Sequence, residues 1–500
     1  MFPKNARSGA SLALTLVALC APLAAIAADK TSLEPDIVVE QDWDSNIFET
    51  TNNPQGSMVT IVRPALRFSD VGETGFFRAG GWLASNSYWE ESKLNGVDRG
   101  ISLDFDEKLS RRWSAFGSGS LQYLAAHNEI RANDTVTSNS SGQPIVTPGQ
   151  VLEGNVPDVN IDQGIGGIRY ELTPLSTLSF SGGPYSVRYG QSDAGGTDNR
   201  NRDGWTAGVD LTHRLTTMDT VSLGVDASNT DQQNVSFLGV EGLAFQPTLV
   251  ELQTGKSVSD QQSINLGWTR TWNEAWSTDV TLGVRRLHTR STDVSTPATG
   301  VTLFFIPLQS KAFALTDFDD TSPLVVGEIR VARTFLRSAL SLGFTRETRS
   351  ASSGATSDVN VSTFDLLFTH RLAERVTLRL NGSWEFSENA NDTNNLEGAS
   401  YIQGSFDPVT GPKYECPTGK LIVTGSGPDK IGQCEVGGGS TLRSQSLLLS
   451  ARLDWQLRKR LGTFAVFRYY DRSGDQQLFG NDYNKFNFGV GFRYFYDLDL

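Results

Sequence analysis

The segment from Lys485 to Leu500, "KFNFGVGFRYFYDLDL", alternates between apolar and small or polar side chains. Its even positions are all apolar or aromatic, and its odd positions carry mainly Asn, Gly, Arg and Asp, with Phe495 as the exception. Successive side chains of a strand point to opposite faces. The pattern therefore predicts a strand with one apolar face and one polar face.

The same alternation recurs along the chain. It is clear in "GISLDFDEKL", "WTAGVDLTHRL", "VSLGVDAS" and "VTLRLNGSWEF", none of which fits the i, i+3, i+4 spacing of a helix. Hydrophobic residues make up only 38% of the chain. Beyond the N-terminal region, no stretch approaches the roughly 20 apolar residues of a membrane-spanning helix.

Short and long connections also alternate. "TTMDT" after Leu215 and "NEA" after Trp272 are short, whereas the polar stretches at about 126–158 and 389–440 are long. Short turns at one end, long loops at the other and aromatic residues at strand ends are typical of outer-membrane barrels. A secreted soluble β-solenoid or sandwich would require none of these features. We therefore expect an all-β fold, a transmembrane antiparallel up-and-down β-barrel of about 18 strands (about 16–18), with short periplasmic turns and long extracellular loops.

The N-terminus predicts export. Lys4 and Arg7 precede an apolar run, and Ala25-Ile26-Ala27 is a small-x-small cleavage pattern. We expect a signal peptide at residues 1–27 and a single barrel domain at 28–500, located in the cell outer membrane. An uncleaved membrane anchor, the alternative, would need a longer apolar run.

The terminal strand resembles the signal read by the barrel-assembly machinery. Asn487, Gly489, Phe492 and Tyr494 match its polar-x-Gly-x-x-aromatic-x-aromatic form, although the chain continues through "FYDLDL". We therefore expect that machinery and outer-membrane lipid as partners. The formal net charge of −13 argues against nucleic acid as a partner.

Two cysteines follow the predicted signal peptide, Cys416 and Cys434. In an exported chain a close pair predicts a disulfide that closes a loop. No His lies nearby to complete a metal site, so we expect neither a metal nor a cofactor. "DFDD" at Asp317–Asp320 lacks the spacing of an EF-hand, and solvated surface acids are the simpler interpretation.

Catalytic motifs are missing from the sequence. It contains no G-x-S-x-G and no H-E-x-x-H, and its four His residues stand in no obvious grouping with a nucleophile and an acid. We do not expect an enzyme.

If the apolar faces meet lipid, the polar faces line a lumen. The charged residues predicted to face it are Asp104, Asp106, Asp210, Arg214, Asp226, Asp279, Arg285, Glu328, Arg330, Asp365, Arg379, Arg452, Asp454, Arg468 and Arg493. Acids dominate the early strands and bases the late ones, so the two could oppose each other across the lumen. Alternatively, the charges pair locally.

Two segments resemble a known family. Trp43-Asp44-Ser45-Asn46-Ile47-Phe48 and the stretch Val59–Asp70, with Pro64, are similar to the first two strands of the β-barrel porins associated with exopolysaccharide and PEP-CTERM (exosortase) loci of Gram-negative bacteria. The resemblance implies an outer-membrane barrel without established catalytic residues. It makes a porin-like conduit for exopolysaccharide or related solutes the first hypothesis, with polysaccharide or polysaccharide-export proteins as partners. A non-conducting barrel whose long loops bind polysaccharide or a partner is the second.

Overall fold

The computed structural model describes most of the chain after residue 27. The described residues are 28–48, 54–125, 135–138, 144–147, 158–189, 201–239, 250–297, 302–303, 306–307, 313–350, 358–389, 396–398, 400–401, 414–415, 420–424, 431–435, 443–474, 482–496 and 498–499. The predicted signal peptide and Cys416 lie outside them.

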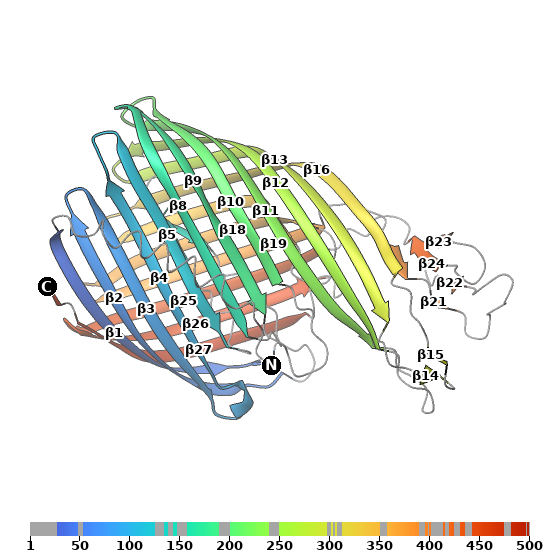
Figure 1. Cartoon of the computed structure of the whole chain (residues 1–500). Coiled ribbons are helices and arrows are strands. Elements are labelled where there is room, and N and C mark those ends of the chain that lie inside the picture. The colour runs from blue at the N-terminus through green and yellow to red at the C-terminus, as the bar shows by residue number, and fades with distance from the viewer. Residues whose placement is uncertain are drawn as a thin grey trace.

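The strands form one closed antiparallel barrel of 18 strands (Figure 1), which confirms the predicted fold class. In chain order they are β1 (Ala28–Asp44), β2 (Ser57–Gly72), β3 (Gly75–Tyr88), β4 (Gly96–Lys108), β5 (Trp113–Leu124), β8 (Val159–Thr173), β9 (Ser176–Tyr189), β10 (Asn201–Arg214), β11 (Asp219–Gly239), β12 (Val250–Asn273), β13 (Trp276–Pro297), β16 (Phe313–Thr334), β17 (Ser338–Ser350), β18 (Asp358–Ala373), β19 (Val376–Asn389), β25 (Arg443–Arg458), β26 (Leu461–Gly474) and β27 (Tyr483–Phe495). Each pairs with its neighbours in this order, and β27 pairs with β1 from Asp36 opposite Phe495 to Asp44 opposite Asn487. The short strand β28 (Leu498–Asp499) continues along β1.

Smaller elements lie in the connections. They are the 3-10 helix η1 (Ser92–Leu94) and the short strands β6 (Thr135–Ser138), β7 (Pro144–Thr147), β14 (Thr302–Leu303), β15 (Ile306–Pro307), β20 (Leu396–Gly398), β21 (Ser400–Tyr401), β22 (Tyr414–Glu415), β23 (Lys420–Thr424) and β24 (Ile431–Glu435). Within the described part of the chain, no helix is long and apolar enough to cross a membrane.

The alternation of residue types becomes two faces of the barrel wall. On β27 the apolar side chains of the alternating set point outward and are 44–58% exposed; they are Phe486, Phe488, Val490, Phe492 and Tyr494. Ile264, Leu266, Leu282 and Val284 are similarly exposed on β12 and β13. Soluble proteins do not leave an apolar belt of this extent in water, whereas a barrel in a bilayer requires one. The chain is a membrane-spanning barrel.

Four adjacent strands are the longest of the barrel. β11, β12, β13 and β16 have 21, 24, 22 and 22 residues, whereas about 9–11 residues cross the hydrocarbon. Their short turns are level with the others, so the extra length projects from the long-loop end of the barrel (Figure 1). β1 begins and β27 ends at the opposite, short-turn end.

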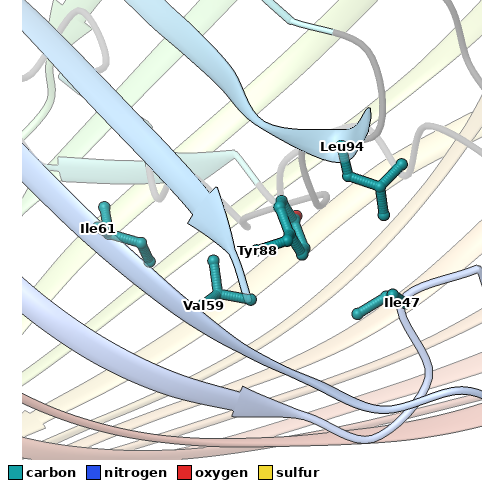
Figure 2. Packing of buried hydrophobic residues seen from close by; sticks show 5 residues of the cluster. All are labelled: Ile47, Val59, Ile61, Tyr88 and Leu94. Atoms are coloured by element: carbon teal, nitrogen blue, oxygen red, sulfur yellow. The ribbon is translucent and has the colours of Figure 1, made fainter. Parts of the chain in front are cut away.

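A small apolar cluster lies at the long-loop mouth (Figure 2). Ile47 and Leu94, from the connections after β1 and β3, pack with the inward-facing Val59, Ile61 and Tyr88. The Ile47 amide donates to the Gln55 carbonyl, with 2.8 Å between N and O. These connections therefore fold against the inner wall at β1–β3, and we call the five residues the mouth cluster.

Candidate functional site: the inner wall of the barrel

The strand register assigns every position to a face. At the pairing of β1 and β27, Trp43 lies opposite the outward-facing Phe488, and Asp42 lies opposite Gly489 on the other side of the sheet. Asp42 is almost completely buried, whereas Trp43 is exposed. Following directly opposed residues from strand to strand extends this inner face around the barrel.

The charged residues predicted to face the lumen all occupy inner-face positions in this register. They are Asp104 and Asp106 on β4, Asp210 and Arg214 on β10, Asp226 on β11, Asp279 and Arg285 on β13, Glu328 and Arg330 on β16, Asp365 on β18, Arg379 on β19, Arg452 and Asp454 on β25, Arg468 on β26 and Arg493 on β27.

Their described contacts run along the wall. Arg452 Nε lies 2.9 Å from Asp454 Oδ1, and Arg379 Nε lies 3.8 Å from Asp454 Oδ2. Arg330 Nη2 lies 3.1 Å from Glu328 Oε1. These are pairs between residues of the same or the neighbouring strand, so opposite charges screen each other locally.

Two further bases pair with the predicted acids on β4. Arg169 of β8 lies 2.7 Å from Asp106, and Arg78 of β3 lies 4.0 Å from Asp104. Neither arginine is among the residues predicted from the sequence to face the lumen. Both stand at alternating positions of their strands, but only the register shows which acid each one faces.

Among the described contacts, the seam between β1 and β27 holds the largest group of ion pairs. The inner face of β1 carries Glu34, Asp36, Glu40, Asp42 and Asp44. Arg493 contacts both oxygens of Asp36, at 2.8 Å from Nη2 to Oδ2 and 3.1 Å from Nε to Oδ1. Arg468 contacts Asp42 at 3.4 Å and Glu40 at 3.6 Å, and Lys485 contacts Asp44 at 3.3 Å.

This acidic stripe was missed in the sequence, although alternation in "EPDIVVEQDWD" is a signal for it. Glu40, Asp42, Asp44 and Lys485 are buried. Removing one member of a buried ion pair leaves an uncompensated charge, which is strongly destabilising. Substitutions of these seam residues are therefore expected to destabilise the barrel.

A contrasting sector runs from β9 to β12. Its described inner face carries mainly Ser, Thr, Gln, Asn and Gly, and between Arg202 and Arg214 its charged residues are Asp210 and Asp226. The Asp226 carboxylate accepts hydrogen bonds from Asn265 Nδ2 at 2.8 Å and from Ser263 Oγ at 3.4 Å. This part of the wall presents hydrogen-bonding groups with little charge.

Several inward side chains lie flat over glycines of neighbouring strands. A Cβ at Gly224 would come within 2.5 Å of Asp210 Oδ1, and one at Gly100 would come within 2.6 Å of Trp82 Nε1. A Cβ at Gly491 would likewise meet the ring of Phe464. Glycine is needed at these positions because a neighbouring side chain occupies the space that a Cβ would fill. Because these side chains lie along the sheet, the wall is thin at these positions.

Two histidines face outward beside short turns. Ser176 Oγ lies 2.8 Å from His213 Nδ1, and Ser338 Oγ lies 2.6 Å from His370 Nδ1. The sequence alone does not indicate this grouping, because serine and histidine meet only through strand pairing. Within the described residues, each of these rings has this serine as its side-chain hydrogen-bond partner.

The assembly-signal residues divide between the faces. Asn487 and Gly489 point inward, and Phe492 and Tyr494 point outward. Among the described residues, no three His, Cys, Asp or Glu side chains are grouped to hold a metal ion. The side chain of Cys434 lies outside the described set, as does Cys416.

No protein-family model and no curated protein matches this chain. Among solved structures, it is similar to the ferric-catecholate import receptor Fiu from E. coli K12 in its open form, with 10% identity, coverage of 93% of this chain and 82% of that chain, and a TM-score of 0.44. It is also similar to the alcaligin outer-membrane receptor FauA from Bordetella pertussis, with 9% identity, coverage of 93% and 76%, and a TM-score of 0.41.

Proposed function

We propose that this protein is a porin-like conduit in the outer membrane of a Gram-negative bacterium. The observation that carries the proposal is the exposure of charged side chains on the inner wall. Arg78 and Asp104 are 57% and 49% exposed, and Arg379 is 54% exposed. Inward residues of a packed barrel would be buried, whereas barrels of about 16–18 strands leave an aqueous channel.

The predicted export signal and the terminal strand support the outer membrane as its location. Asn487, Gly489, Phe492 and Tyr494 match the form read by the barrel-assembly machinery, which is the partner that we propose for insertion. The resemblance of the Trp43–Phe48 segment to porins of exopolysaccharide loci supports polysaccharide, or a related solute, as the cargo.

Conduction can be measured directly. Purified protein reconstituted in planar bilayers is expected to give stepwise conductance, and heat-denatured protein is the matched control. The mature protein should also fractionate with the outer membrane and migrate differently on gels before and after heating. Recovery as a soluble periplasmic protein would contradict the membrane assignment.

A second function is favoured by the projecting strands. β11, β12, β13 and β16 extend beyond the rim on one side of the barrel (Figure 1). They could hold a surface that binds polysaccharide or another protein while the barrel serves as an anchor. A properly folded, heat-modifiable protein that gives no conductance would favour this function.

A further inference from the structure

We infer that the conduit serves uncharged polar solutes, such as sugars, and discriminates little between cations and anions. The inference rests on the proposed conduit and names its class of cargo. It follows from how charge is distributed over the described inner wall.

Charge is balanced strand by strand over one part of the wall. Within the described inner-face positions, β18, β19 and β25 each carry one acid and one arginine, whereas β13 and β16 each carry one arginine and two acids. On β25 the two groups, Arg452 and Asp454, are in direct contact at 2.9 Å. A strand whose charges cancel at this range creates little field across a wide aqueous lumen, because salt screens what remains.

The most highly charged part of the wall is compensated at the seam. The inner face of β1 is acidic from Glu34 to Asp44, and the inner face of β26 and β27 carries Arg468, Arg472, Lys485 and Arg493 without a described acid. Closure places these strands side by side, so that Arg468, Lys485 and Arg493 contact four of the five β1 acids. Charges paired in this way leave little field to attract counter-ions along the conduit.

The sector from β9 to β12 supplies the hydrogen-bonding surface. Side chains such as Ser179, Thr206, Ser228 and Asn265 offer hydroxyl and amide groups that both donate and accept hydrogen bonds. A polyhydroxylated solute can exchange its water for such groups, whereas between Arg202 and Arg214 of β10 an ion meets charge only at Asp210 and Asp226.

Ion selectivity gives the first test. With the protein in a planar bilayer under a KCl gradient, the reversal potential should correspond to a K⁺ to Cl⁻ permeability ratio within about threefold of one. Asp454→Asn should shift the reversal potential toward anion selectivity, and Arg379→Gln should shift it toward cation selectivity. Asp203→Asn, on the outer face, is the matched control and should leave it unchanged.

Solute selectivity gives the second test. Proteoliposomes should take up glucose at least as fast as gluconate and protonated glucosamine, which are close to it in size. A reversal potential that shows strong preference for one ion sign, or faster uptake of either charged sugar, would overturn the inference while leaving the conduit in place. A complete lack of both conductance and uptake would overturn the conduit and this inference with it.

Discussion

Individual glycines set the thickness of the barrel wall. Asp210 and Asp226 on neighbouring strands each lie over the glycine opposite, Gly224 and Gly208 respectively. A side chain that lies along the sheet does not occupy the lumen. The width of the conduit therefore depends on positions that carry no side chain.

Gly224→Ala should narrow the lumen. The added Cβ would come within 2.5 Å of Asp210 Oδ1, closer than real contacts allow, so the carboxylate must turn toward the lumen. We expect lower single-channel conductance with unchanged amounts of folded protein. Gly343→Ala is the matched control, because its Cβ would meet Asp365 Cβ at an ordinary 3.6 Å. Equal conductance in both variants would show that Asp210 moves within the plane of the wall.

At the level of strands, charge specifies how the barrel closes. Backbone hydrogen bonds alone permit β27 to pair with β1 in registers shifted by two residues, because the faces are preserved. The acidic stripe and its basic partners distinguish these registers, since a shift would separate Arg493 from Asp36 and Lys485 from Asp44. The sequence thus encodes closure in the side chains of its two terminal strands.

Reversing one charge at the seam should destabilise the barrel. Arg493→Asp should cost about 1–3 kcal/mol, less than a fully buried pair, because Arg493 is 41% exposed while Asp36 is 9% exposed. The double variant Asp36→Arg/Arg493→Asp should recover most of the loss. Arg78→Asp, at an exposed pair of the lumen, should cost about 0–1 kcal/mol. Denaturant unfolding in detergent measures all three, and a double variant no better than the single one would contradict an ion-pair role.

Local alternation predicted the strand faces well and the contacts poorly. The apolar side chains from Phe486 to Tyr494 could be assigned to the lipid face because apolar residues alternate there with a period of two, which neighbouring residues show directly. The ion pairs of Arg468 and Arg493 join residues more than 400 positions apart, and they exist only once the first and last strands meet. The pairing of Ser176 with His213 needs the register of a hairpin, which residue types do not supply.

For the whole molecule, the bilayer determines which face of the barrel wall tolerates a charged side chain. Leu366 and Leu367 of β18 are consecutive residues with 39% and 36% exposure, the first facing outward and the second inward. Both are leucines of similar exposure, but Leu366 faces the hydrocarbon of the bilayer and Leu367 faces the lumen.

Leu366→Asp should block assembly and Leu367→Asp should not. Basic residues on the lipid face cost about 2–4 kcal/mol at the midplane and acidic ones somewhat less, whereas a charge in an aqueous lumen remains hydrated. Quantifying the heat-modifiable band in outer-membrane fractions measures the folded amount of each variant. Comparable folded amounts of the two variants would mean that the lumen holds no water at the level of Leu367.

The projecting strands also have a mechanical consequence. β11 and β12 are paired without a break from Asp219 opposite Arg270, at the short turn, to Gly239 opposite Val250, beyond the rim. Hydrogen bonds perpendicular to the strands share any load placed along them. A pull on the outer tip, from a polymer or a neighbouring cell, would therefore be transmitted as shear into the part of the wall held by the membrane, with no hinge in between to absorb it.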